Sequence, residues 1–239
     1  MFSGYYPEIL SQAVADYPRE AVWLITEAGC RKVRNIAKDP EATFCISGKD
    51  SAAAAAEGLL AVVHSHPDFP ACPSAADMRG QISSGVPWGI VRTDGVTAEA
   101  PVWFGDLSNS PPLLGRGYRH GVTDCYSLIR DYYWKELSQV LPEFPRDWQW
   151  WTSGEDLYRT GFAPANFRVI PQTEAAPGDV WLAQIKSPVP NHGGVLLESG
   201  LILHHPGSGS PVDNTQLSRR EPITRWLPYI TTWLRHESR

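Results

Sequence analysis

The chain has 239 residues, of which 42% are apolar and 20% charged, and its formal net charge at pH 7 is −5. This length and composition are those of a globular protein with one large domain or two ordinary ones. The acidic balance and the lack of any basic run argue against a nucleic-acid partner. There is no run of about 18 apolar residues, so we expect no membrane span.

The cysteines and the N-terminal stretch favour a protein made in a reducing cytosol. The first residues carry neither a basic nor an apolar leader segment, so we expect no signal peptide. The cysteines are scattered and form no CxxC pair, which argues against a disulfide scaffold. They are Cys30, Cys45, Cys72 and Cys125.

The first part of the chain predicts an α/β domain with a mixed sheet, because strand and helix patterns alternate along it. The expected helices lie at 7–17, 49–57 and 75–83, and the expected strands at 21–26, 31–36, 43–47, 59–63 and 88–92.

The composition changes at residues 105–112, which read GDLSNSPP and have the character of a linker. We therefore expect one domain at 1–104 and a second at 113–239. In the second domain the patterns predict a helix at 126–137 and strands at 180–185, 193–197 and 201–203.

The stretch LLAVVHSHPDFPACPSAAD contains a candidate metal site. Alternate residues of a strand point to one side, so His64 and His66 can face one centre. Ser74 is a suitable helix N-cap, and the helix that it begins can bring Asp77 back toward the two histidines. Two histidines and one aspartate, with a position left for water, are the ligand set of a catalytic zinc.

The spacing of these residues resembles the signature of the JAB1/MPN/Mov34 (JAMM) metalloproteases. This resemblance implies a Zn²⁺ ion held by His64, His66 and Asp77. It also implies that Glu20 deprotonates the zinc-bound water and that Ser74 helps to stabilise the oxyanion.

Alternatives remain open for this segment. The histidines can be ordinary strand-end residues beside a capped helix. Cys72 can be a further ligand, although three ligands are already supplied and a passive thiol is favoured. JAMM relatives often continue Glu-Ala-Cys-Gly, whereas this chain has Trp23 at the fourth position, and its bulk bears on the cleft beside Glu20.

A candidate nucleophile lies at the start of the helix predicted for 126–137. The dipole and the unpaired N–H groups of a helix N-terminus favour a thiolate at Cys125. His192 and His204 lie in neighbouring predicted strands, where a histidine can meet the thiol and a third polar group can orient it. The alternative is that Cys125 is a small buried apolar residue.

These residues resemble the NlpC/P60 cysteine peptidases, which have a papain-like α+β fold. The matching pieces are Asp124-Cys125, Pro177-Gly178-Asp179, His192-Gly193-Gly194 and His204. The resemblance implies that Cys125 is the nucleophile, His192 the general base and His204 the group that orients it, with Tyr118 shaping the oxyanion site. A one-residue slip of the strand would put His205 in the place of His204.

A JAMM-type domain followed by an NlpC/P60-type domain resembles the tail assembly protein K family of lambda-like bacteriophages. The resemblance implies a tail-tip hydrolase that is made in the host cytoplasm and acts at the cell wall, with peptidoglycan stem peptides and tail-tip proteins as partners. The second domain would be a peptidoglycan endopeptidase, and the first a zinc peptidase or isopeptidase acting in tail assembly or infection. The alternative is a structural or assembly component with vestigial sites.

Overall fold

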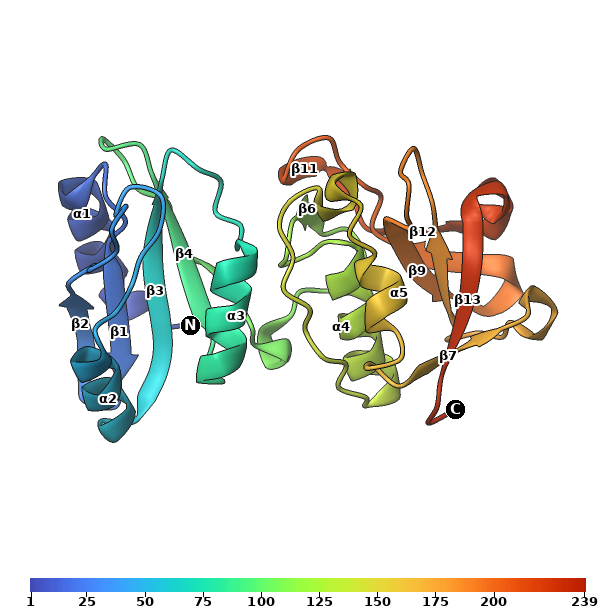
Figure 1. The fold of residues 1–239 in the computed structure, drawn as a ribbon, viewed down its shortest axis with the longest axis horizontal. Coiled ribbons are helices and arrows are strands. Elements are labelled where there is room, and N and C mark those ends of the chain that lie inside the picture. Colours follow the sequence, from blue (N-terminus) through green and yellow to red (C-terminus); the bar gives the residue numbers. More distant parts are fainter. The chain divides into compact units, whose positions relative to one another are not determined.

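The computed structural model describes residues 1–239. The chain forms two compact units, one of Met1–Pro73 with Arg79–Asp106 and one of Ser74–Met78 with Leu107–Arg239. Figure 1 shows a sheet with flanking helices in each half of the chain. None of the helices combines the length and the apolar character needed to span a membrane.

The first unit is built on a five-stranded mixed sheet with the strand order β2-β1-β3-β4-β5. β3 and β4 run parallel, and the other neighbouring strands run antiparallel, which confirms the predicted α/β class. The strands are β1 (Val22–Thr26), β2 (Gly29–Val33), β3 (Leu59–Pro67), β4 (Trp88–Thr93) and β5 (Val102–Phe104). The helices in this half of the chain are α1 (Tyr6–Asp16), α2 (Gly48–Ala56) and α3 (Ala75–Ser84).

The two faces of this sheet have different roles. On one face, Trp23 of β1 and Val63 of β3 lie directly opposite each other and join Ile9 of α1 in an apolar cluster. Successive side chains of a strand point to opposite faces, so the next cross-strand pair, Val22 and His64, faces the other side. The apolar face therefore anchors β3 and leaves its histidines on the opposite face.

The strand predicted for residues 43–47 is wrong, because this segment is an irregular loop. The side chain of Asn35 makes two of the hydrogen bonds that a neighbouring strand would make, and the backbone N–H of Ile36 donates to the Cys45 carbonyl (3.0 Å). Nδ2 of Asn35 donates to the carbonyl of Thr43 (3.0 Å), and its Oδ1 accepts from the N–H of Cys45 (3.1 Å). The loop carries Phe44, whose ring centroid lies 4.7 Å from that of His64.

The second unit is built on a six-stranded sheet in the order β12-β10-β9-β8-β13-β7, with a separate β11-β6 pair. All of these pairings are antiparallel, which agrees with the predicted α+β class. The strands are β6 (Gly117–Arg119), β7 (Phe167–Ile170), β8 (Val180–Ala183), β9 (His192–Leu196), β10 (Leu201–His204), β11 (Val212–Leu217), β12 (Arg219–Pro222) and β13 (Ile230–His236). The α-helices are α4 (Cys125–Leu137) and α5 (Leu157–Gly161).

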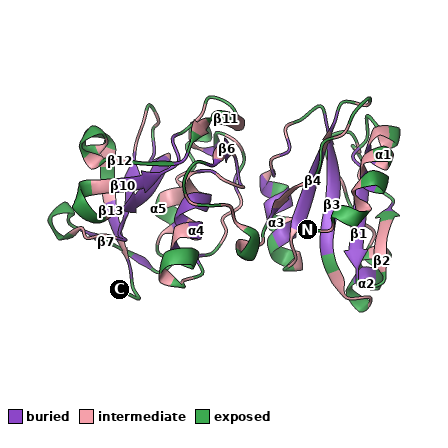
Figure 2. Cartoon of the chain, turned by 180° about the vertical axis from the view of Figure 1, so that it is seen from behind, coloured by how far each residue is buried: buried purple, intermediate pink, exposed green.

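Short 3-10 helices complete the connections. They are Ser3–Tyr5, Leu107–Asn109, Trp150–Ser153, Gln172–Glu174, Glu198–Gly200, Ile223–Arg225 and Leu227–Tyr229. In each unit the central strands are buried, whereas many of the helical turns and loops are exposed (Figure 2).

α4 packs on the second sheet and brings its first residue close to β9. Ile129 and Tyr133 of α4 share an apolar cluster with Leu182 of β8 and Val195 of β9. Close packing also explains Gly194 in β9, because a Cβ there would lie 2.5 Å from the Leu203 carbonyl oxygen. A side chain at that position would force β9 and β10 apart.

Candidate functional site

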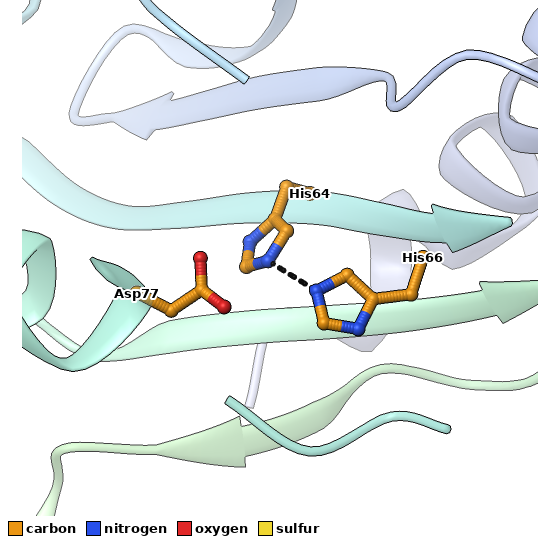
Figure 3. A group of neighbouring side chains, drawn as sticks. All are labelled: His64, His66 and Asp77. Carbon is orange, nitrogen blue, oxygen red and sulfur yellow. Dashed lines mark hydrogen bonds between the residues drawn. The ribbon is translucent and has the colours of Figure 1, made fainter. Parts of the chain in front are cut away.

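The structure brings together the three predicted metal ligands. His64 and His66 come from β3, Asp77 comes from the first turn of α3, and all three are buried. One ligand atom from each lies within 4.8 Å of the other two. Figure 3 shows the carboxylate facing the two imidazoles, whose Nε2 atoms are 3.0 Å apart.

Neighbouring groups hold these donors in position. Nδ1 of His66 is 3.1 Å from the Pro70 carbonyl oxygen, which can only accept, so Nδ1 donates and the Nε2 of neutral His66 carries a lone pair. Oδ2 of Asp77 accepts from the N–H (2.8 Å) and the hydroxyl (2.7 Å) of Ser74. Supporting hydrogen bonds of this kind orient the ligands in protein metal sites. This set of two imidazoles and a carboxylate therefore fits a divalent metal.

The structure places Glu20 next to this group along the sheet. Val22 pairs with His64, and the N–H of Ser65 donates to the Ala21 carbonyl (2.9 Å), so the same register puts Glu20 opposite His66. Cross-strand partners lie on the same face of a sheet. Glu20, which is buried, therefore shares the face of the two histidines.

Two further expectations about this site depend on where side chains point. Trp23 lies on the opposite face of β1, where its Nε1 donates to Gln12 of α1 (2.7 Å), so its bulk does not shape the Glu20 side of the sheet. The hydroxyl of Ser74 accepts from the N–H of Asp77 (3.1 Å) as well as donating to its carboxylate. The structure thus gives Ser74 a capping role, and its oxyanion role stays a prediction.

In the second unit, Asp124 fixes the start of α4. Its side chain accepts from the N–H of Ser127 (2.9 Å) and from the N–H of Gly121 (2.8 Å), and it forms an ion pair with Arg146 (2.9 Å). Burial alone would raise the pKa of Asp124, but the charge of Arg146 and these hydrogen bonds hold it well below its ordinary value. The ionised cap holds Cys125 at the first position of the helix.

Cys125 is a protonated thiol at neutral pH in this structure. Burial raises the pKa of the thiol to about 11, and the charge of Asp124 adds to the effect. The thiolate expected from the helix N-terminus is therefore not the resting state, because desolvation outweighs the helix dipole. Tyr158 of α5, whose hydroxyl lies 3.3 Å from Sγ, acts in the opposite direction, as does the N–H of Gly193.

The contact with Gly193 places the sulfur beside the first residue of β9, which is His192. Nε2 of His192 lies 3.0 Å from Nδ1 of His204, so the structure joins the two predicted histidines. His205 instead faces away, with Nε2 2.9 Å from the Arg116 carbonyl oxygen. The strand register thus places His204 rather than His205 against His192.

Both histidines of this pair are neutral at pH 7. Burial lowers the pKa of His192 well below its ordinary value, and the neighbouring His204 adds to this. Burial also lowers the pKa of His204 to about 4, although the charge of Glu221 opposes the shift. An uncharged imidazole that lines the same cavity as a protonated thiol is suited to act as a general base.

A cavity of about 760 Å³ is lined by Cys125, His192 and Tyr118 together. Aromatic side chains make up much of its wall, among them Tyr126, Phe144, Trp150, Trp151, Tyr158, Phe162 and Trp226. The ring of Tyr118 lies edge-on to His205, with centroids 5.2 Å apart. The thiol therefore opens into a largely apolar space suited to a substrate.

Two residues beside this site were not predicted from the sequence. Tyr158 contacts the thiol, and its only signal was its place in an aromatic-rich stretch after the tryptophan cluster. Glu221 reaches His204 with Oε1 2.6 Å from Nε2, and no spacing motif marks it.

Models of known protein families match both halves of the chain. The model of prokaryotic homologs of the JAB domain matches residues 3–104, and that of the NlpC/P60 family matches residues 115–230. Tail tip assembly protein K of Escherichia phage lambda is 36% identical over 182 residues, covering 75% of this chain and 83% of the relative. The chain belongs to the tail tip assembly protein K family.

A second sequence relative carries the same name. Tail tip assembly protein K of Escherichia phage N15 is 31% identical over 206 residues, covering 82% of each chain. A crystal structure of the P60 domain of an antigen from M. avium subspecies paratuberculosis matches 54% of this chain and 88% of its own, with 18% identity and a TM-score of 0.34. The membership in the protein K family rests on the sequence relatives, not on that structural match.

Proposed function

We propose that the second unit is a cysteine peptidase that cleaves peptidoglycan stem peptides. The observation that carries this proposal is that Cys125 and His192 line one cavity, with the sulfur at the N–H of the residue that follows His192. Membership in the NlpC/P60 family supports the choice of substrate.

Because the Cys125 thiol and the His192 imidazole both begin uncharged, the order of proton transfers follows. His192 takes the proton of Cys125 as the sulfur attacks the carbonyl carbon of the scissile amide. It then gives that proton to the leaving nitrogen, which departs as an amine and leaves a thioester. Water, deprotonated by His192, attacks the thioester, releases the carboxylic acid and restores the thiol.

The test is turbidity loss of purified cell walls, followed by mass analysis of the released peptides. We expect the wild-type protein to clear walls and Cys125→Ala to leave them intact. Cys45→Ala is the matched control, because Cys45 is exposed and lies in the first unit. Equal clearing by Cys125→Ala and wild type would overturn the nucleophile assignment.

We infer that the JAB-type half binds Zn²⁺ through His64, His66 and Asp77 and acts as a metallopeptidase or isopeptidase. The fit of the buried donors and the JAB family match support this. Bound zinc would supply a Lewis acid and a water of lowered pKa, and Glu20, on the sheet face of the two histidines, would take a proton. The test is metal analysis of purified protein. We expect Asp77→Asn to reduce zinc content and the exposed Asp39→Asn to retain it, and a metal-free wild type would refute the inference.

The family name supports a role in the phage tail. We propose that the protein is made in the host cytoplasm, associates with tail-tip proteins and acts at the cell wall from the tail tip or an assembly intermediate. Mass spectrometry of purified particles tests for its presence in the virion. If Cys125→Ala and Asp77→Asn both support assembly of infectious tails as well as wild type, the assembly role depends on neither the cysteine peptidase nor the metallopeptidase activity.

A further inference from the structure

Glu221 lies on β12, next to β10, and contacts His204 on the side away from His192. In the β10–β12 pairing Glu221 is opposite Ile202, so its side chain reaches His204 diagonally on the same face. Oε1 of Glu221 is 2.6 Å from Nε2 of His204 and accepts from Nε1 of Trp226 at 2.8 Å. The side chain of Glu221 is 10% exposed and that of His204 is fully buried.

The surrounding charges keep Glu221 ionised. Partial burial raises the pKa of Glu221, but the hydrogen bonds from Trp226 and His204 and the charge of Arg219 outweigh it and lower the pKa below its ordinary value. Arg219 and Arg225 both face Oε2, at 3.5 and 3.4 Å. Glu221 is therefore a carboxylate at neutral pH and can only accept hydrogen bonds.

This carboxylate determines where each proton lies in the hydrogen-bonded series Glu221–His204–His192. Nε2 of His204 must donate to Glu221, so in neutral His204 Nδ1 carries the lone pair. That lone pair accepts from Nε2–H of His192, which is 3.0 Å away. In neutral His192 the lone pair is then on Nδ1, the nitrogen that does not face His204.

We propose that Glu221 is a positioning residue that sets the tautomers of His204 and His192, so that Nδ1 of His192 is the base for the thiol of Cys125. The proposal rests on the proposed peptidase function. When His192 takes the thiol proton, the positive charge lies one imidazole away from Glu221 and is stabilised by it. The charged and titratable groups around the pair are Glu221, Arg219 and His205, with Arg225 against Glu221. The rings of Trp181 and Trp226 pack against both histidines.

The first test is ¹⁵N NMR of the imidazole nitrogens at pH 7 in the folded, full-length protein. We expect His192 and His204 to be Nε2–H tautomers in the wild type. Glu221→Gln should keep them, because its amide oxygen can still accept from Trp226 and His204, whereas Glu221→Ala should give mixed tautomers. Wild-type tautomers in folded Glu221→Ala would overturn the proposal.

The second test is the pH profile of kcat/KM for wall peptides. Both variants remove a negative charge near the pair, which lowers the imidazole pKa, so the acid limb should move to lower pH. Glu221→Ala should also lose about 100-fold in kcat with little change in KM, less than the ~10⁴-fold loss when the residue bonded directly to a catalytic histidine is altered. Glu221→Gln should recover most of that loss.

Glu198→Gln is the matched control, because Glu198 is exposed and carries the same charge. An acid limb that stays in place in Glu221→Gln would overturn the proposal even if Glu221→Ala fails to fold. If the wild type cleaves no wall peptide but shows the expected tautomers, the peptidase function fails while the tautomer assignment stands.

Discussion

The two candidate sites differ in how far apart their parts lie in the sequence. In the first half, the metal donors and their supporting groups except Glu20 lie within fourteen residues, from His64 to Asp77. In the second, the site residues come from α4, α5, β9, β10 and β12, and they are Cys125, Tyr158, His192, His204 and Glu221. A local site is largely specified by a motif and one turn, whereas a dispersed site depends on strand register and helix packing.

The sites also differ in electrostatics. The first brings together two imidazoles and a carboxylate, whose lone pairs could bind one divalent cation. In the second, the thiol and both histidines are uncharged, because burial lowers the pKa of both histidines and raises that of the thiol. The first site should therefore respond to metal removal, and the second to pH.

The largest expected effect is that a substitution in one site removes the property of that site and leaves the property of the other unchanged. Cys125→Ala should reduce wall cleavage by at least about 10³-fold, since loss of a nucleophile removes the whole covalent route. The same variant should keep its zinc, and Asp77→Asn should lose zinc while still cleaving walls. Zinc content and turbidity measured on the same preparations check this. Loss of both properties in either variant would show that the sites depend on each other.

A smaller effect concerns stability at acid pH. The pKa of His204 is about 4 in the folded protein, against about 6.5 when unfolded, so the unfolded chain binds more protons between these values. The contribution to stability is fully present above about pH 6.5 and is lost as the pH falls toward 4, by up to roughly 3 kcal/mol. Urea unfolding at pH 7 and pH 4.5 measures it. His204→Gln should show a smaller pH dependence, and an equal dependence would contradict the assignment.

The smallest effect concerns the thiol itself. The hydrogen bond from Tyr158 lowers the pKa of Cys125, so Tyr158→Phe should raise that pKa further. We expect alkylation of Cys125 by iodoacetamide at pH 8 to slow by several-fold, about what one lost hydrogen bond implies. Peptide mass spectrometry follows this cysteine alone. Tyr132→Phe on α4 is the control, and faster alkylation in Tyr158→Phe would instead mean that Tyr158 blocks access.

Much of the architecture follows from the sequence. Short continuous apolar runs predicted β1, β3 and β4, and helical spacing predicted α1 and α4. The strand expected at 43–47 failed because the side chain of Asn35, a partner that no periodicity shows, satisfies that backbone.

The candidate sites were predictable to different extents. The spacing from His64 to Asp77 sufficed because one strand and one helix turn bring the donors together. The direction of the Cys125 pKa shift depends on burial by residues distant in sequence. The contact of Glu221 with His204 depends on the β10–β12 register, which no local pattern reveals.

Gly194 has a consequence for how this protein can change. The space beside it is closed by the Leu203 carbonyl and by the ring of Trp181, so every single-residue substitution there adds atoms where none fit. His204, which pairs directly with Gly194 across the sheet, would be displaced from His192 by any such addition. Substitution at this one position would therefore separate His204 from His192, and a lineage that loses the glycine would need either reversion or a compensating change in β10 to restore their contact.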